Sequence, residues 1–181
     1  MAPKIKFTYF DIEGAGEPTR LALALSETPY EDNRIKFPEW KDLKPKTPYG
    51  GLPLMEIGDG PVKTQSGAML RWVGAECSDT LYPRDKLYDI EEALGVVGDL
   101  RSAWEPCLYM GMRPEKFGYE EGFGKTDQGK ELIKTLRERF VKNDLPGMLE
   151  RFEGLINKNG GKWLVAGDDP TIADCMAVSF L

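Results

Sequence analysis

Any catalytic chemistry in this 181-residue chain has to proceed without histidine, because the sequence contains none. Hydrolases with an imidazole base, zinc sites with histidine ligands and phosphohistidine transfer all need that side chain. Proton transfer is therefore left to tyrosines, carboxylates, lysines or a bound ligand. The cysteines, Cys77, Cys107 and Cys175, are isolated and form no CxxC pair, so we expect reduced structural thiols and no dithiol redox site.

The charge balance excludes a second group of functions. Lys and Arg number 24 against 30 Asp and Glu, a net charge of -6, whereas nucleic-acid-binding proteins present a basic face to phosphates. The chain has no run of about 18 apolar residues, and its N-terminus, MAPKIKFTYF, lacks the apolar stretch of a signal peptide. We therefore expect a cytoplasmic protein that acts on small organic molecules or binds a protein partner, with no nucleic acid and no membrane involved.

The first 80 residues carry the turns and short apolar segments of a small α/β domain. Four strands are expected, at residues 4–10, 30–36, 54–57 and 62–65. Helices are expected to begin near Glu17-Pro18, where proline occupies the first turn, and at Ser66. The order, βαβ followed by ββα, places Leu52-Pro53 at the entrance to the third strand, and an X-Pro bond is the only common place for a cis peptide.

Beyond Cys77 the pattern predicts only helices. Residues 78–85 form a polar linker with a proline, which is typical of a domain boundary. Helices are expected over residues 88–110, over residues 127–156 with an interruption at Pro146, and from Thr171 onward. The predicted organisation is an α/β domain over 1–80 and an all-helical domain over 81–181.

This order of elements resembles the cytosolic glutathione transferases, and motifs along the whole chain sharpen the resemblance. The motifs are Thr8-Tyr9-Phe10-Asp11-Ile12 with Gly14, Gly16-Glu17-Pro18 and Arg20-Leu21, Trp40 with Lys44, Gly50-Gly51-Leu52-Pro53, Gln65-Ser66, Gly98-Asp99-Leu100, and Val165-Ala166-Gly167-Asp168 through Thr171-Ile172-Ala173-Asp174. They are most similar to the tyrosine-type classes, nearest the sigma class. The resemblance implies a thioredoxin-like N-terminal domain, glutathione as co-substrate, a homodimer and no metal.

The resemblance gives Tyr9 a catalytic role, a hydrogen bond to the glutathione sulfur. A thiol with a pKa near 8.5 is mostly protonated at neutral pH, and lowering its pKa by about two units requires roughly 2.7 kcal/mol. One charge-assisted hydrogen bond contributes about 1.5–3 kcal/mol, so a single tyrosine hydroxyl can supply most of that. The alternative is an aromatic strand residue that packs under the next helix.

The resemblance also assigns the residues that bind glutathione. They are Tyr9, Trp40, Lys44, Gly50, Gly51, Leu52, Pro53, Gln65, Ser66 and Asp99. Leu52 would present its backbone to the cysteinyl part, as an added strand does, and the helix beginning at Ser66 would receive the γ-glutamyl carboxylate. Trp40 and Lys44 would hold the glycine carboxylate. The alternatives are an ordinary turn, a simple N-cap serine, and a surface lysine beside a partly buried tryptophan.

Asp99 and the second substrate involve the helical half of the chain. Asp99 resembles the carboxylate that the family extends across a subunit interface to the glutathione amine, and a solvated helix aspartate is the alternative. A small apolar electrophile is expected between Phe10 and the long helix, where Arg101, Trp104 and Leu108 recur at helical spacing. Core packing explains that spacing equally well.

The sequence departs from the family pattern in two places. Ala15 stands where the family often carries an arginine near the sulfur, and Glu13 where another arginine is common, so positive charge near the thiolate is reduced. Family chains also continue through further helices, whereas this chain stops within the helix that begins at Thr171, so the helical domain is expected to be truncated. Thr171 and Asp174 resemble the family's structural capping box and are assigned to folding.

The expected function is transfer of the glutathione thiolate to small electrophilic, apolar molecules. Glutathione-dependent isomerisation or peroxide reduction would use the same thiolate. The alternative is a non-catalytic family member with a structural or assembly role, since fold does not determine function. Ala15 and the short C-terminus favour that alternative slightly, and the intact set of glutathione residues argues against it. A thioredoxin-type dithiol oxidoreductase would need a cysteine in the loop after Tyr9.

Overall fold

The computed structural model describes residues 4–180 and divides into two compact units. The first unit joins residues 1–94 to residues 163–181, and the second contains residues 95–162. This division follows spatial contacts, and the predicted domain boundary between residues 80 and 81 stays a prediction. No helix among residues 4–180 is long and apolar enough to cross a membrane.

A three-stranded sheet with the order β2-β1-β3 forms the base of the first unit. The strands are β1 (Ile5–Phe10), β2 (Tyr30–Ile35) and β3 (Leu54–Ile57). β1 pairs in parallel with β2 and antiparallel with β3, so it is the central strand. Its side chains alternate, and Ile5 and Phe7 are almost completely buried, as the apolar positions of the sequence predict.

The fourth predicted strand, over residues 62–65, is present only as one antiparallel bridge. Lys63 exchanges two backbone hydrogen bonds with Met55, at 2.7 and 3.0 Å, beyond the Gly58–Gly60 turn. Pro61 has no N–H group, and Gln65 leaves the extended conformation with φ 74°, so the ladder cannot grow in either direction. The βαβ-βα core of a thioredoxin-like domain is nevertheless complete.

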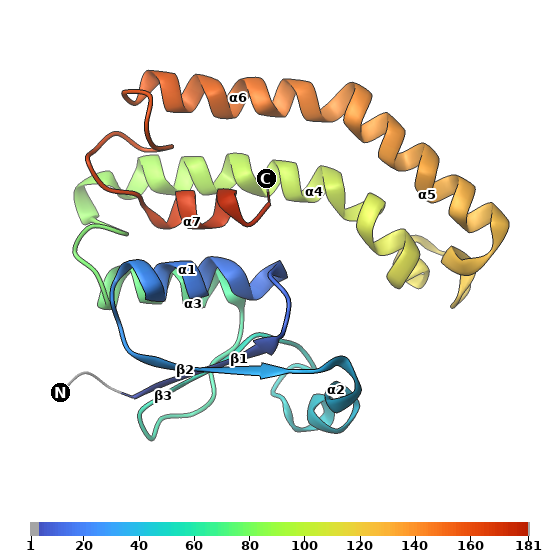
Figure 1. The fold of residues 1–181 in the computed structure, drawn as a ribbon, viewed down its shortest axis with the longest axis horizontal. Coiled ribbons are helices and arrows are strands. Elements are labelled where there is room, and N and C mark those ends of the chain that lie inside the picture. The colour runs from blue at the N-terminus through green and yellow to red at the C-terminus, as the bar shows by residue number, and fades with distance from the viewer. Residues whose placement is uncertain (1–3, 181) are drawn as a thin grey trace. The chain divides into compact units, whose positions relative to one another are not determined.

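The first unit also contains short helices. They are α1 (Glu17–Leu25), α2 (Phe37–Leu43), α3 (Ser66–Glu76) and α7 (Ile172–Val178). α1 and α3 lie on one face of the sheet, and α7 packs on α1 (Figure 1). A Cβ atom on Gly74 would lie 2.6 Å from Ile172, so the glycine allows α3 and α7 to approach closely.

α7 is closed at its start by the predicted capping box. The carboxylate of Asp174 accepts hydrogen bonds from the backbone N–H of Thr171 at 2.8 Å and of Leu164 at 2.9 Å. Both Thr171 and Asp174 are buried, so these bonds satisfy groups that water cannot reach. Burial also raises the pKa of the neighbouring Cys175 thiol to about 12, which makes it a structural thiol.

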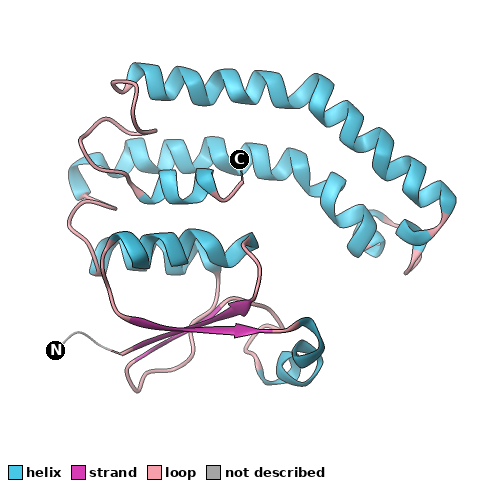
Figure 2. Ribbon diagram, viewed as in Figure 1, coloured by secondary structure: helices cyan, strands magenta, loops and turns pink. Residues whose placement is uncertain are grey.

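The second unit consists of antiparallel helices. α4 (Leu87–Met112) starts in the first unit and continues into the second, where it is followed by α5 (Asp127–Arg139), a π-helical turn (Phe140–Asp144) and α6 (Leu145–Lys158). Figure 2 shows α5, the turn and α6 as one helical run. The rings of Trp104 on α4 and Phe140 on the turn lie 5.1 Å apart.

The interruption predicted at Pro146 lies one turn earlier, at the π-helical residues 140–144. Pro146 falls in the first turn of α6, where its missing N–H group costs little. Pro106 lies inside α4, where the sequence pattern predicts one continuous helix. There the Nε atom of Arg137 donates to the carbonyl oxygen of Cys107 at 3.3 Å, so a side chain from α5 meets a backbone group beside the proline.

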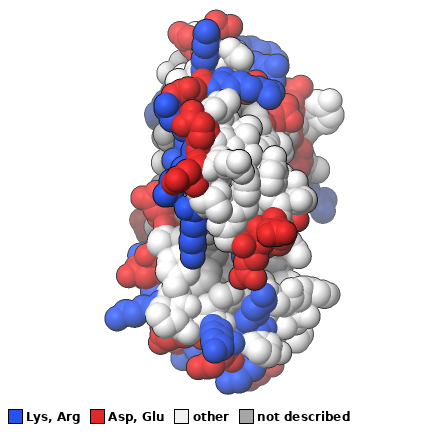
Figure 3. Space-filling view, turned by 90° about the vertical axis from the view of Figure 1, so that its right-hand side faces the viewer, with Lys and Arg blue, Asp and Glu red and all other residues white. Residues whose placement is uncertain are grey.

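Acidic and basic side chains are interspersed on the face of the molecule drawn in Figure 3. Charged side chains of the protein form ion pairs, such as Lys116 with Glu105 at 3.4 Å. Charges of both signs on this face fit the modest net charge of -6.

Candidate active site

Tyr9 lies near the end of β1, with its side chain directed into the turn that leads to α1. Its hydroxyl oxygen accepts a hydrogen bond from the backbone N–H of Ala15 at 3.1 Å. The residue is 8% exposed, so this bond is shielded from most competing water. The amide N–H uses one lone pair of the hydroxyl oxygen. The phenolic hydrogen therefore stays available to donate to a substrate atom.

Two glycines make room for the Tyr9 side chain. A Cβ atom on Gly14 would lie 2.8 Å from the Tyr9 hydroxyl oxygen, and one on Gly16 would lie 2.5 Å from the ring. Gly14 also has φ 47°, in the left-handed region that glycine favours. The glycine pattern of the motif is therefore explained by the tyrosine that it surrounds.

The segment 52–54 lies beside Tyr9 because of the strand register. Thr8 on β1 is paired with Leu54 on β3, and the same register continued would place Pro53 opposite Tyr9. The peptide bond between Leu52 and Pro53 is cis, as the position of the proline suggested. The register therefore directs the segment that contains Leu52 toward the end of β1 that carries Tyr9, and the role of Leu52 stays a prediction.

Gln65 and Ser66 stand at the start of α3. Gln65 has φ 74° and ψ 101°, a conformation that costs a non-glycine residue energy and that concentrates at functional sites. The carbonyl oxygen of Gln65 accepts bonds from Ala68 and Met69, and the helix begins at Ser66 without a side-chain cap. The simple N-cap role for Ser66 is therefore wrong, since Gln65 occupies the cap position.

Trp40 and Lys44 come from α2 and the turn that follows it. Trp40 is half-buried and its ring meets Phe10 edge-on at 5.8 Å, while Phe37 stacks on Phe10 at 4.5 Å. Lys44 is exposed, and its Cε atom lies 3.7 Å from where a Cβ on Gly50 would be. The structure thus brings Lys44 to the glycine turn and Phe10 to the aromatic residues of α2.

The remaining predicted residues lie on α4 in the second unit. An Asp99 carboxylate oxygen is 3.9 Å from the guanidinium of Arg151, with both side chains more than half exposed, so the pair is weak. Trp104 is half-buried, whereas Arg101 and Leu108 are exposed. Packing into the core therefore does not explain the spacing of the three, and the roles of Asp99 and of the second-substrate residues stay predictions.

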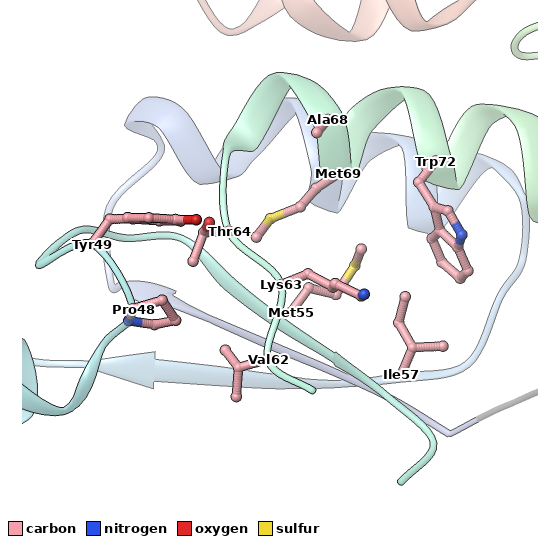
Figure 4. Close-up of a pocket in the computed structure, with 10 residues that line it drawn as sticks. All are labelled: Pro48, Tyr49, Met55, Ile57, Val62, Lys63, Thr64, Ala68, Met69 and Trp72. Atoms are coloured by element: carbon pink, nitrogen blue, oxygen red, sulfur yellow. The ribbon is translucent and has the colours of Figure 1, made fainter. Parts of the chain in front are cut away.

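A cavity of about 520 Å³ lies between β3, residues 62–64 and α3 in the first unit (Figure 4). Its lining residues are Pro48, Tyr49, Met55, Ile57, Val62, Lys63, Thr64, Ala68, Met69 and Trp72. None of these is a predicted glutathione residue, but Tyr49 precedes Gly50 and Thr64 precedes Gln65. The cavity therefore borders the segments that the sequence analysis singled out. Within residues 4–180 no three His, Cys, Asp or Glu side chains are grouped as metal ligands.

Arg20, for which the sequence predicts no role in the site, is 3% exposed, and its guanidinium carbon lies 5.7 Å from the centre of the Tyr9 ring. A helix arginine usually lies in solvent, so its type gave no signal. The spacing of Arg20 does give a signal. Arg20 comes three residues before the fully buried Leu23, so both residues lie on the inner face of α1.

Comparisons with known proteins agree with this fold and site. Residues 5–75 match the model of the glutathione S-transferase N-terminal domain, and residues 121–181 match that of the C-terminal domain. Glutathione S-transferase 1 of Ascaris suum is 34% identical over 179 residues, which cover 99% of this chain and 79% of the relative. The chain therefore belongs to the glutathione S-transferase family.

Solved structures support the same family. The glutathione S-transferase of Ascaris lumbricoides has a TM-score of 0.71 at 30% identity, covering 97% of this chain and 78% of its own. Prostaglandin synthase D of Nilaparvata lugens has a TM-score of 0.77 at 29% identity, covering 98% and 79%. The predicted thioredoxin-like domain followed by helices is confirmed, and the family is one of enzymes that use glutathione as a substrate.

Proposed function

We propose that this chain joins glutathione to small, apolar electrophiles, and that Tyr9 stabilises the attacking thiolate. The observation that carries the proposal is the hydrogen bond from the Ala15 N–H to the Tyr9 hydroxyl oxygen. It holds the oxygen in the turn between β1 and α1 and leaves the phenolic hydrogen to donate to sulfur. A hydrogen bond to a charged group contributes about 1.5–3 kcal/mol, close to the roughly 2.7 kcal/mol that lowers a thiol pKa by two units.

Glutathione would bind along the edge of the first unit. Leu52 would pair its backbone with the cysteinyl part, beside Tyr9 in the register of β1 and β3. The N-terminus of α3, with Ser66, would receive the γ-glutamyl carboxylate, because the first N–H groups of a helix have no intrahelical partner. Trp40, Lys44 and the turn at Gly50-Gly51 would hold the glycine carboxylate. The proximity of Lys44 to Gly50 supports this assignment.

The reaction needs no protein nucleophile. The glutathione thiol loses its proton to solvent water, the sulfur forms a bond to the electrophilic carbon, and the leaving group departs with the electron pair of the bond that breaks. The Tyr9 hydroxyl would donate a hydrogen bond to the sulfur throughout. Ala15 offers no side-chain charge here, so the backbone N–H and Tyr9 carry the stabilisation that an arginine would share.

Isomerisation is the second candidate, since a related structure at 29% identity is named prostaglandin synthase D. In that case the thiolate would add to the substrate and leave again, so that glutathione would be regenerated. Residues Phe10, Arg101, Trp104 and Leu108 would then select the second substrate. Assays with a model electrophile and with an isomerisable substrate, run on the same preparation, decide between the two.

A homodimer and a cytoplasmic location complete the proposal. In a dimer Asp99 would reach the glutathione amine of the second copy, and its exposure leaves the carboxylate accessible for that contact. The weak pair with Arg151 would be exchanged at little cost.

The direct test compares wild type with Tyr9→Phe in a glutathione conjugation assay. The variant keeps the ring and removes the hydroxyl, so we expect the rate at neutral pH to fall about 10- to 100-fold. Tyr88→Phe, which changes a tyrosine that is 79% exposed, is the matched control and should leave the rate unchanged. Wild type that neither binds glutathione nor conjugates it would favour a structural role for the protein.

A further inference from the structure

Arg20 is a buried cation that donates two hydrogen bonds to the segment that follows Tyr9. Its Nη1 atom donates to the carbonyl oxygen of Ile12 at 2.8 Å, and its Nη2 atom donates to that of Phe10 at 3.1 Å. The two carbonyls flank the first residues of the turn between β1 and α1. The planar guanidinium can reach both at once because its donors have a fixed fork geometry.

Two carboxylates also contact the guanidinium. Nε donates to Asp32 on β2 at 3.1 Å, and Nη1 lies 3.3 Å from Glu17. Asp32 is shared with Arg34, whose Nε is 2.7 Å away. Burial and the charge of Asp32 raise the pKa of the nearby Tyr30 phenol, and Arg20 lowers it.

The same guanidinium lies beside two aromatic rings of β1. Its central carbon is 5.7 Å from the Tyr9 ring and 5.8 Å from the Phe7 ring, within the range of a cation–π contact. Two carboxylates offset its charge locally, so a long-range field at the Tyr9 hydroxyl is small. Its effect on Tyr9 is therefore geometric, through the ring and through the two carbonyls.

We propose that Arg20 is a positioning residue for Tyr9: it fixes the turn at Phe10 and Ile12 and so keeps the Tyr9 hydroxyl against the Ala15 N–H. This inference rests on the proposed role of Tyr9. It gives the buried cation a part in the reaction beyond its ion pair with Asp32. It also gives the turn a rigid side-chain support where the family's usual arginine near the sulfur is replaced by Ala15.

The experiment measures the pH profile of kcat/KM for glutathione in Arg20→Lys. Lysine keeps the charge but cannot bond both carbonyls and Asp32 together. We expect a rate at neutral pH about 10-fold below wild type and an apparent thiol pKa higher by about one unit. In a Tyr9→Phe background the same substitution should change the rate less than about twofold, because Arg20 acts through Tyr9.

Arg34→Met is the matched control. Arg34 also pairs with Asp32, but it is exposed and does not touch the carbonyl of Phe10 or Ile12. We expect its rate and apparent pKa to equal those of wild type. Asp32→Asn weakens the ion pair and leaves both carbonyl bonds of Arg20, so it should lower stability without moving the pKa.

The outcomes separate the two proposals. An inactive wild type that binds no glutathione overturns the proposed function. The role of Arg20 alone is overturned by a different result. In that result wild type is active and Tyr9→Phe slows it, but Arg20→Lys lowers the rate equally with Tyr9 and with Phe at position 9 and leaves the thiol pKa unchanged. If circular dichroism shows that Arg20→Lys does not fold, the Asp32→Asn variant is the test. A raised thiol pKa in Asp32→Asn would show that the ion pair, and not the two carbonyl bonds, controls the thiol, and it would overturn positioning through the turn.

Discussion

The turn between β1 and α1 is built around one side chain. Gly14 and Gly16 leave the space that the Tyr9 ring and hydroxyl occupy, and the Ala15 N–H binds the hydroxyl oxygen. The two glycines are therefore explained by steric fit to Tyr9, and the Ala15 backbone by its hydrogen bond to Tyr9. We expect changes at these positions to move the Tyr9 side chain.

Gly16→Ala tests the steric part of this arrangement. Gly16 has φ -86° and ψ -28°, which alanine adopts without strain, so the only conflict is the 2.5 Å approach of the new Cβ to the Tyr9 ring. We expect the ring to shift, conjugation to fall at least about tenfold, and stability to decrease by about 1–3 kcal/mol. Conjugation rates and urea unfolding measure the two effects.

Gly154→Ala is the control for this substitution, because no atom lies within 4 Å of its new Cβ on α6. Removing a helix glycine there should raise stability by about 0.5–1 kcal/mol and leave the rate as in wild type. Full activity in Gly16→Ala would show that the position of the Tyr9 ring does not matter.

Short motifs in the sequence predict the candidate residues of the site, and the roles of these residues stay predictions. Tyr9, Leu52-Pro53 and Ser66 lie in segments that the structure places at adjoining strand and helix ends. Arg20 could not be assigned, because its meaning depends on Asp32, which is distant in the sequence and meets it only after β1 and β2 pair.

An ion pair joins the helices α3 and α4. Arg71 on α3 donates two bonds of 2.7 Å to the carboxylate of Glu91 on α4, and the Tyr82 hydroxyl donates a third at 2.6 Å. The bonds from Arg71 are the main reason that the pKa of Glu91 lies below its ordinary value of 4.5. This contact joins α3 to the first turns of α4.

The stability of the first unit should therefore depend on the charge of Glu91. A carboxyl whose pKa is lowered by folding contributes stability above its unfolded pKa, near 4.5, and loses the contribution as pH falls through the folded value. We expect the urea midpoint of wild type to fall more steeply below about pH 4.5 than that of Glu91→Gln. Parallel curves for the two proteins from neutral to acid pH would contradict this.

The elements themselves follow closely from local patterns. The strands around β1, the helices that start at Glu17 and Ser66 and the capping box at Thr171 are present as expected. The two predictions that failed concern the pairing of strands and the place where a helix is interrupted. A hairpin pattern over residues 54–65 gives one bridge, since Pro61 has no donor, and the long helix is interrupted at the π-helical turn, where Phe140 packs on Trp104.

At the scale of the whole molecule, the family could be predicted because its motifs are spread along the chain. The two matches, to residues 5–75 and 121–181, cover both ends of the sequence. The compact units could not be predicted in the same way. The segment 163–181 returns to the first unit, where α7 packs on α1, and that contact joins residues far apart in the sequence.

The proposed homodimer leads to a prediction for Asp99. Sedimentation at micromolar concentration should show a dimer, and Asp99→Asn should raise the KM for glutathione several-fold with kcat nearly unchanged, because the lost contact binds substrate in the ground state. Asp168→Asn changes another surface carboxylate and should leave both constants unchanged. A monomer with a normal KM would rule out a contact from Asp99 to a second copy.

The pKa of the bound glutathione thiol shows whether Tyr9 stabilises the thiolate. Ultraviolet absorbance of the thiolate gives this value from a pH titration of the binary complex. We predict a pKa about two pH units below that of free glutathione for wild type and within about half a unit of free glutathione for Tyr9→Phe. An equally low pKa in both proteins would contradict the account.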